Sequence, residues 1–148
     1  MHIVCPHCHT TNRVQPDQLG LSPTCGSCKQ RLFTGHAVAL DSAAFDKHVS
    51  RSQIPVLVDF WASWCGPCRA MAPAYEQAAA RLEPHMRLAK VDTEAVPVIA
   101  QRYRIRSIPT LVLFVDGHEV ARQAGALTSP LQIQQWAKHY AERPKSAA

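Results

Sequence analysis

The sequence predicts an α/β fold in which helices flank a mixed five-stranded sheet, preceded by a small cysteine-rich segment. Apolar runs typical of strands alternate with helical patterns along most of the chain, and this alternation favours parallel strands joined by helices. Near the C-terminal end, Asp116-Gly117 separates two strand-like runs, which indicates a hairpin and adds antiparallel strands. The first 35 residues hold four cysteines but few large apolar side chains, so we expect a segment of a different kind there.

Length and composition limit what the chain can be. With 148 residues, 47% of them apolar and 18% charged, it is long enough for one ordinary domain with an appendage. No apolar run approaches the roughly 18 residues of a membrane span, and residues 1–6 lack the features of a secretory signal. Six cysteines in such a chain favour metal or redox chemistry over structural disulfides, so we expect a cytoplasmic protein. The net charge of +5 is spread along the chain and requires no polyanionic partner.

The N-terminal cysteines follow the spacing C-x2-C-x16-C-x2-C, which is typical of a metal site made of four thiolates. Burial alone cannot hold together a segment of this size. We therefore predict a zinc ribbon over residues 1–35, with one structural Zn²⁺ whose binding is coupled to folding. The expected ligands are Cys5, Cys8, Cys25 and Cys28.

Two alternatives for this segment stay open. Cys5-Pro6-His7-Cys8 has the same dipeptide insert as the oxidising Dsb-type disulfide oxidases and could be a second redox centre, although it lacks the strand and helix that make such cysteines reactive. A histidine could also replace one thiolate as a ligand. We expect the three nearby histidines to be solvated bystanders instead: His2, His7 and His9.

The second part of the chain begins with a strand, a helix and a second strand. Gly35-His36 marks its expected boundary, and residues 37–40 resemble a short strand. The next element is a helix, with Asp41 as its N-cap and its end near Ser50. The apolar run over 54–61 is long enough to predict a central strand buried on both faces.

The remaining elements continue the alternation and then end it with the hairpin. A helix is expected from Cys65 to Leu82, with a kink at Pro73. The elements expected after it are a strand over 87–92, a helix over 95–103, strands over 110–115 and 118–123, and a final helix that opens at Ser129-Pro130. The second domain is thus predicted over residues 36–148, with a frayed tail over 143–148.

A third C-x-x-C unit, Cys65-Gly66-Pro67-Cys68, lies between the long apolar strand and the start of a helix. A helix N-terminus offers unpaired N–H groups and the positive end of the helix dipole, and both stabilise a thiolate. Cys65 is therefore the candidate nucleophile. Cys68 lies one turn into the same helix, where it can attack a mixed disulfide formed at Cys65. We predict that this unit is the redox centre, because the other two units lack its strand and helix.

Asp59 is an unusual residue for a buried strand. Desolvation disfavours the charged form of a buried carboxyl group and raises its pKa toward neutrality, where it can act as an acid or a base. The simpler interpretation is an inert polar group in the core. The position six residues before Cys65 favours a role in catalysis.

Several motifs resemble those of the thioredoxin family, in the same order along the chain: VDFWASWCGPCRAMAP, AKVDTE, SIPT, VDGHEV and AGAL. The resemblance covers about residues 36–141 and implies the thioredoxin fold. With the four-cysteine segment in front, the whole chain is similar to the zinc-containing bacterial thioredoxins of the thioredoxin 2 type. Trp61, within the first motif, is expected only to pack.

The resemblance also implies roles for particular residues. Asp59 would shuttle a proton to or from Cys68, with Lys90 as its ionic neighbour. Pro109 would be a cis-proline opposite the dithiol, and Ile108 would offer backbone hydrogen bonds to an extended substrate. The flat apolar surface that docks partners would consist of Trp64, Gly66, Pro67, Ile108, Pro109 and Gly125.

The leading hypothesis is a monomeric, cytoplasmic protein-disulfide reductase. The resemblance implies that an NADPH-dependent flavin thioredoxin reductase recharges it and that disulfide-bearing proteins are its substrates. A competing hypothesis is a zinc-ribbon binding module that recruits a protein or nucleic acid and has a secondary dithiol activity. A third hypothesis makes the ribbon a redox sensor whose thiolates oxidise and eject zinc. We expect no membrane partner, and we expect the arginines within 102–106 to be a solvated helix end rather than a nucleic-acid site.

Overall fold

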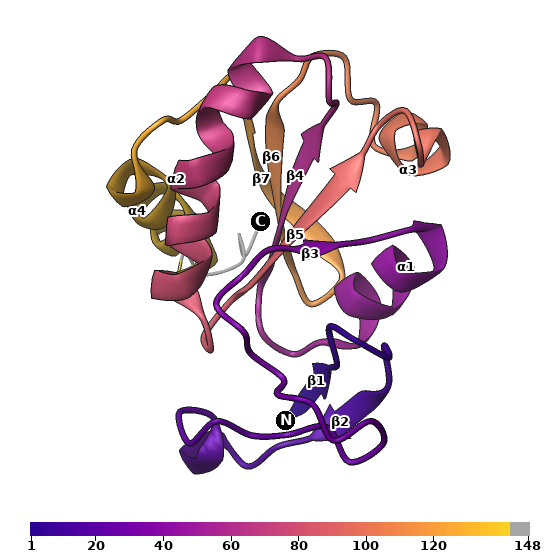
Figure 1. Ribbon diagram of the computed structural model, residues 1–148, viewed down its shortest axis with the longest axis vertical. Coiled ribbons are helices and arrows are strands. Elements are labelled where there is room, and N and C mark those ends of the chain that lie inside the picture. The colour runs from indigo at the N-terminus through magenta and orange to yellow at the C-terminus, as the bar shows by residue number, and fades with distance from the viewer. Residues whose placement is uncertain (143–148) are drawn as a thin grey trace, which may run out of the picture.

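The computed structural model describes residues 1–142, and the expected tail over 143–148 lies outside these described residues. The N-terminal segment forms a small ribbon at one end of the molecule (Figure 1). In it, β1 (His2–Val4) pairs antiparallel with β2 (Thr11–Arg13), and the short 3-10 helix η1 spans Pro16–Gln18. A bridge between Thr24 and Arg31 closes its second half. The first cysteine pair thus lies between β1 and β2, and the second pair lies inside the bridge.

The rest of the described chain forms the α/β domain. Its elements are β3 (Val38–Ala39), α1 (Ser42–Arg51), β4 (Val56–Trp61), α2 (Gly66–Leu82), β5 (Arg87–Asp92), α3 (Pro97–Arg102), β6 (Thr110–Val115), β7 (His118–Ala124) and α4 (Pro130–Glu142). The strands form one sheet in the order β3-β5-β4-β6-β7. β3, β4 and β5 are mutually parallel, whereas β6 and β7 each run antiparallel to their neighbours. The predicted mixed five-stranded sheet is confirmed.

Helices cover both faces of this sheet (Figure 1). α2 and α4 pack on one face, and their apolar cluster includes Leu57 of β4. α1 and α3 pack on the other face, against Val56, Val58 and Phe60. Successive strand residues point to opposite faces, so Asp59 shares the α2 face with Leu57. The central strand is buried on both sides, as its apolar run predicts.

Local signals in the sequence explain several element boundaries. α1 begins where predicted, because the Asp41 carboxylate caps it by accepting a hydrogen bond from the Ala44 N–H (2.8 Å). In the β6–β7 turn, Asp116 and Gly117 both have positive φ (51° and 82°), a conformation that glycine adopts without strain. This pair of left-handed residues suits the twist of a two-residue hairpin, and the predicted hairpin is confirmed.

Several predicted boundaries move inward, two of them by two residues. The central strand begins at Val56, because Ile54 is buried in the apolar cluster of the ribbon instead. α3 begins at Pro97 rather than two residues earlier, because Asp92 Oδ1 first accepts two backbone N–H groups (3.0 and 3.3 Å) in a turn. α2 continues through Pro73, and the kink there stays a prediction.

The ribbon packs against the end of the sheet where the parallel strands begin (Figure 1). The apolar cluster at this junction includes Ile3, Val14 and Leu32 from the ribbon together with Ile54. The backbone N–H of Gln53 donates to the carbonyl of His2 (2.8 Å), so main-chain contacts also cross the junction. The third C-x-x-C unit follows the other end of β4, and the two cysteine sites therefore lie at opposite ends of the sheet.

Candidate functional site

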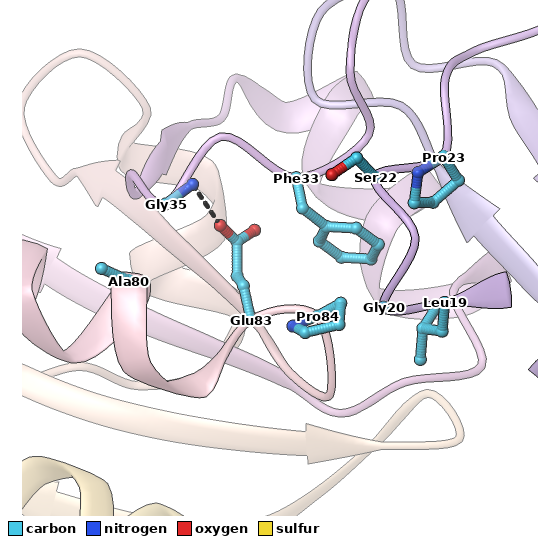
Figure 2. A pocket seen from close by; sticks show the side chains of 9 residues that line it. All are labelled: Leu19, Gly20, Ser22, Pro23, Phe33, Gly35, Ala80, Glu83 and Pro84. Carbon is cyan, nitrogen blue, oxygen red and sulfur yellow. Dashed lines mark hydrogen bonds between the residues drawn. The ribbon is translucent and has the colours of Figure 1, made fainter. Parts of the chain in front are cut away.

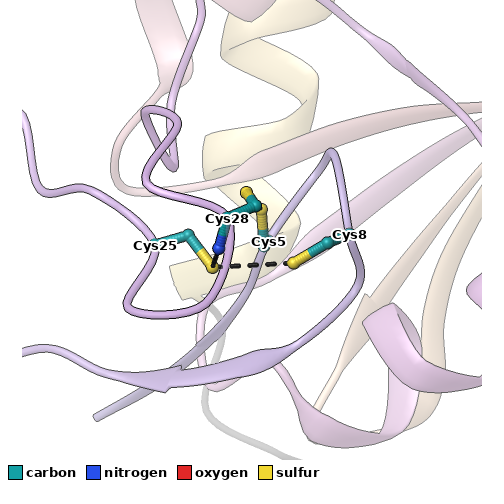
Figure 3. Close-up of side chains that lie close together, drawn as sticks. All are labelled: Cys5, Cys8, Cys25 and Cys28. Atoms are coloured by element: carbon teal, nitrogen blue, oxygen red, sulfur yellow. Dashed lines mark hydrogen bonds between the residues drawn. The ribbon is translucent and has the colours of Figure 1, made fainter.

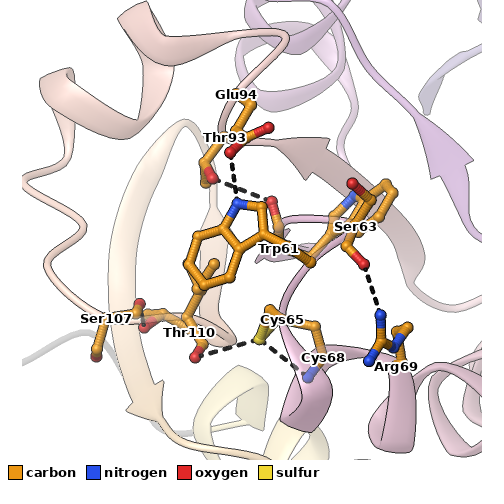
Figure 4. The surroundings of a disulfide bond; sticks show 11 residues. Trp61, Ser63, Cys65, Cys68, Arg69, Thr93, Glu94, Ser107 and Thr110 are labelled. Atoms are coloured by element: carbon orange, nitrogen blue, oxygen red, sulfur yellow. Dashed lines mark hydrogen bonds between the residues drawn. A yellow bond between two sulfur atoms is a disulfide. The ribbon is translucent and has the colours of Figure 1, made fainter.

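The dithiol unit lies where β4 ends and α2 begins. Cys65 is the N-cap of α2, and its Sγ accepts the backbone N–H of Cys68 (3.2 Å). The two cysteines are joined by a disulfide, with their Cα atoms 5.2 Å apart (Figure 4). The hydrogen bond and the helix dipole both act on the Cys65 sulfur, and both favour negative charge there once the disulfide is reduced.

Segments distant in the sequence surround the dithiol. The carbonyl oxygen of Ile108 lies 3.7 Å from Cys65 Sγ, and the Ile108–Pro109 peptide bond is cis, as the resemblance implies. The N–H of Gly125 donates to the Pro109 carbonyl (2.9 Å), which brings the start of the β7–α4 loop to the same place. Trp64 is 63% exposed beside the disulfide. The structure thus brings the residues of the expected docking surface together around Cys65.

Asp59 is buried on the α2 side of β4 with only 1% of its surface exposed. Burial raises its pKa from 3.8 to about 7, and the positive charge of Lys90 opposes this rise. Among the described residues, its Oδ1 has no hydrogen-bond partner. Lys90 is the register neighbour of Asp59 on β5, but its ammonium group lies over the ring of Trp61, 4.7 Å from the centroid. Trp61 is therefore more than a packing residue, because its ring makes a cation–π contact with Lys90, the neighbour of Asp59 on β5.

Two side chains at this site, those of Trp64 and Tyr75, make polar contacts that were not predicted from the sequence. The indole N–H of Trp64 donates to the carboxylate of Glu94, which fixes the orientation of an exposed ring. Tyr75 of α2, completely buried, places its hydroxyl 3.0 Å from the Leu57 carbonyl and 2.8 Å from the Ala89 carbonyl. Glu94 falls within the motif AKVDTE, so the motif indicated its neighbourhood, whereas no motif singles out Tyr75 within its helix.

The four N-terminal cysteines form a compact cluster (Figure 3). Their sulfur atoms all lie within 4.8 Å of one another, with Cys5 and Cys28 3.7 Å apart and Cys8 and Cys25 3.6 Å apart. A tetrahedral zinc site with Zn–S bonds of about 2.3 Å requires sulfur–sulfur separations of about 3.8 Å. The cluster fits a four-thiolate zinc site.

The two halves of this cluster repeat the same backbone arrangement. The N–H of His7 donates to Cys5 Sγ, and the N–H of Ser27 donates to Cys25 Sγ, both at 3.3 Å. Hydrogen bonds to Cys25 Sγ, above all from the backbone of Cys28, lower the pKa of that thiol to about 6. These bonds stabilise the Cys25 thiolate, the form that binds a metal. At Cys5 burial outweighs the equivalent bond and raises the pKa to about 12.

The expectation that all three nearby histidines are solvated is wrong for one of them. His2 and His7 are exposed. His9 is half-buried, and its Nδ1 lies 3.1 Å from Nε2 of His48, a buried residue of α1. The ribbon docks on α1 at this point, so the His9 ring belongs to the junction between the two parts.

A disulfide-linked C-x-x-C pair at a helix start, at the carboxyl end of the central strand of this sheet, defines a thiol–disulfide oxidoreductase. No helix within residues 1–142 is both long and apolar enough to cross a membrane.

Comparisons with known proteins agree with this class. Residues 36–139 match the family model described as Thioredoxin, and residues 4–30 match a zinc-ribbon model described as Thioredoxin 2, N-terminal. Thioredoxin C-3 of Corynebacterium nephridii is 46% identical over 136 residues, 92% of each chain. Thioredoxin 1 of Synechococcus elongatus is 47% identical over 91 residues, which cover 62% of this chain and 85% of that protein. A mutant thioredoxin from Halobacterium salinarum NRC-1 has a similar solved structure, with a TM-score of 0.66 and 29% identity over 76% of this chain and 97% of its own.

The chain belongs to the thioredoxin family, and it carries the N-terminal zinc ribbon of the thioredoxin 2 type.

Proposed function

We propose that the chain reduces protein disulfides, with Cys65 as the nucleophile and Cys68 as the resolving thiol. The observation that carries this proposal is the place of Cys65 at the N-cap of α2, where its sulfur accepts a backbone N–H. A thiolate is stabilised in this position, and the thiolate is the form that attacks a disulfide. Trp64 and Gly66, the residues on either side of Cys65, are exposed, so an incoming disulfide can approach this end of α2.

The reaction proceeds by two exchanges. The Cys65 thiolate attacks one sulfur of the substrate disulfide, whose S–S bond breaks; a mixed disulfide forms and the first substrate thiolate leaves. Cys68 then loses its proton and attacks the Cys65 sulfur, which releases the second substrate thiolate and forms the Cys65–Cys68 disulfide. Two electrons pass from the dithiol to the substrate, and the two released thiolates take up protons.

We assign Asp59 as the group that accepts the Cys68 proton. With a pKa of about 7, the carboxyl group exchanges protons readily at neutral pH. Its place on the α2 face of β4 supports this role, because Cys68 is a buried residue of α2. Lys90, held over the Trp61 ring, is assigned the role of keeping the pKa of Asp59 from rising further.

The substrate is proposed to dock on the exposed surface around the dithiol. The Ile108 carbonyl, which lies 3.7 Å from Cys65 Sγ, marks where the backbone of an extended substrate would pair. The contact from Glu94 to the Trp64 indole supports a preset orientation for the largest apolar group of this surface. The docking residues are Trp64, Gly66, Pro67, Ile108, Pro109 and Gly125.

For the ribbon, we propose one structural Zn²⁺ held by all four thiolates of the cluster. The sulfur separations support this ligand set, and the ion would supply the cohesion that a segment of this size lacks. The ribbon is assigned to residues 1–35 and the redox domain to residues 36–148. The ligands are Cys5, Cys8, Cys25 and Cys28.

The reducing equivalents are proposed to come from NADPH through a thioredoxin reductase, and the substrates to be proteins with accessible disulfides. Membership of the thioredoxin family supports both assignments. We further propose a monomer that works in the cytoplasm, where reduced thiols persist.

Insulin reduction coupled to NADPH and a bacterial thioredoxin reductase tests the assignment of the two thiols. Cys65→Ser is expected to abolish turnover. Cys68→Ser is expected to stop after the first exchange and to accumulate a mixed disulfide at Cys65, detected by mass spectrometry. Ser63→Ala, at an exposed position next to the site, serves as the matched control. Activity that survives in Cys65→Ser would refute the assignment.

A further inference from the structure

Arg87, the first residue of β5, is a completely buried cation at the junction between ribbon and sheet. Its Nη1 donates to Glu83 Oε2 (2.6 Å), an ion pair in which both side chains are buried. Its Nη2 donates to two ribbon carbonyls, that of Val4 (3.1 Å) and that of Leu32 (2.8 Å). One guanidinium group thus links α2, β5 and both halves of the ribbon.

The remaining contacts of this ion pair also lead to the N-terminal segment. The ring of Phe33 lies against the guanidinium group, 4.8 Å from its central carbon to the ring centroid. Glu83 Oε1 accepts the backbone N–H of Gly35 (2.7 Å), as Figure 2 shows at the pocket between ribbon and α2. A buried ion pair is costly unless such hydrogen bonds satisfy its atoms. Here the N-terminal segment supplies three of those partners, while Arg87 Nε has none among the described residues. The pair therefore depends on the docked ribbon.

The two carbonyls that bind Arg87 belong to the framework of the cysteine cluster. Val4 directly precedes Cys5, and its N–H donates to Ser52 Oγ (3.1 Å). Both the N–H and the carbonyl of Val4 are thus hydrogen-bonded to residues of the redox domain. Leu32 follows the second cysteine pair, and its N–H closes that loop by donating to the Pro23 carbonyl (3.0 Å). Arg87 therefore binds the chain at Val4, before the first cysteine pair, and at Leu32, after the second pair.

We propose that Arg87 is a positioning residue for the zinc site, which holds the two halves of the ribbon in the register that closes the four-thiolate cluster. Mutation of a residue that orients the metal ligands without binding the metal commonly lowers metal affinity by about 10–100-fold. The coupling is reciprocal, because a contact that favours the metal-bound ribbon is in turn favoured by the metal. Zinc retention and the docking of the ribbon on β5 then form one linked equilibrium.

The test is the rate of zinc transfer from the full-length, zinc-loaded protein to a chromogenic chelator. Arg87→Lys keeps the charge beside Glu83 but lacks the planar fork whose two nitrogens bind Glu83 and the two carbonyls. We therefore expect zinc release about 10–100-fold faster than in the wild type. Arg81→Met, an exposed arginine of α2, is the matched control and should release zinc at the wild-type rate. Wild-type release from Arg87→Lys would overturn the proposal.

A loss of global stability could also speed zinc release, and a second series separates the two causes. Ile133→Val and Ile133→Ala weaken the core between α2 and α4, away from the ribbon cluster. They lower the melting temperature by a small and a large amount, so that the value of Arg87→Lys can be compared with theirs. Arg87→Lys must release zinc faster than a core variant of equal melting temperature. Equal rates at equal melting temperature would reduce Arg87 to a merely structural residue and refute the proposal.

The reciprocal effect has its own readout. In zinc-free Cys8→Ser protein, amide exchange should accelerate at Gly35, whose N–H is bonded to Glu83, relative to the zinc-loaded wild type. Unchanged exchange there would contradict the linkage. Neither readout depends on the dithiol, so a failure here leaves the proposed reductase function standing.

Discussion

Replacement of Asp59 by asparagine tests the central electrostatic argument. The folded protein binds the Asp59 proton with a pKa of about 7, against 3.8 ordinarily, because burial disfavours the carboxylate. Below pH 3.8 the group is protonated in both the folded and the unfolded chain. As the pH rises, the unfolded chain releases its proton first, so the folded protein loses stability until the pH passes about 7. At about 1.4 kcal/mol per tenfold difference in proton affinity, the gap between the two values corresponds to about 4 kcal/mol.

Asparagine cannot ionise, so Asp59→Asn should escape this loss. Relative to the wild type, the variant is expected to gain about 2 kcal/mol in free energy of unfolding at pH 5 and about 4 kcal/mol at pH 8. Urea unfolding of both proteins, zinc-loaded and with the disulfide intact, followed by tryptophan fluorescence, measures the difference at each pH. Titration of the ribbon thiols is common to both proteins and cancels.

The dependence on pH carries the test. Asp17→Asn, which makes the same change at an exposed position of η1, is the matched control. If the gain of Asp59→Asn did not vary between pH 5 and 8, or if it decreased with pH, Asp59 would not titrate as burial requires. The same variant should resolve the mixed disulfide more slowly at neutral pH, because it lacks a proton acceptor for Cys68.

Three further substitutions probe contacts around the two sites. Lys90→Met removes the charge that opposes the raised pKa of Asp59, so the pH midpoint of single-turnover disulfide reduction should move up; an unmoved midpoint would show that Lys90 does not act on this carboxyl group. Tyr75→Phe leaves buried carbonyl groups without their hydroxyl partner and should cost about 1–3 kcal/mol in urea unfolding, whereas a neutral result would mean that these bonds contribute nothing net. Arg104→Gly relieves a non-glycine residue at φ 53° and should stabilise the protein by about 1 kcal/mol in thermal melts; destabilisation would indicate that the Arg104 side chain makes a compensating contact.

Most of the fold could be predicted because its signals are local. The bounds of β5 and β6 agree with the predicted runs over 87–92 and 110–115. β6 is a compact apolar stretch, and β5 carries Leu88, Ala89 and Val91 among charged residues. The Asp41 cap and the Asp116-Gly117 turn depend on side-chain and backbone chemistry within four residues. The dithiol was located by the same kind of reasoning, from the strand before it and the helix after it.

The contacts across the junction could not be predicted in this way. Arg87 binds the Val4 carbonyl across 83 positions of the chain, and no periodicity relates the two. In the sequence Arg87 is one charged residue at a strand start, a place where arginine is usually exposed. Its burial follows from the ribbon covering that strand start, and the pairing of His9 with His48 has the same origin. Only the folded chain places these partners together.

The three C-x-x-C units share a backbone hydrogen bond as well as their spacing. In each of them the N–H four residues after the first cysteine donates to the carbonyl of that cysteine, at 3.0 Å for His9, 2.9 Å for Lys29 and 3.1 Å for Arg69. In the ribbon this residue, His9 or Lys29, has positive φ (62° and 67°), and the chain turns back after it. The N–H of Cys5 therefore donates to the Thr10 carbonyl (2.9 Å), and the N–H of Cys25 donates to the Gln30 carbonyl (2.8 Å).

Arg69 instead continues a helix. Each ribbon pair is therefore held on a closed loop that presents two sulfur atoms to the other pair. Within residues 1–142 no second cysteine pair faces Cys65 and Cys68, and their sulfur atoms are bonded to each other. The conformation of one residue after the motif thus separates a metal site from a redox site, because it decides whether the chain returns beside the first cysteine or leads away from it.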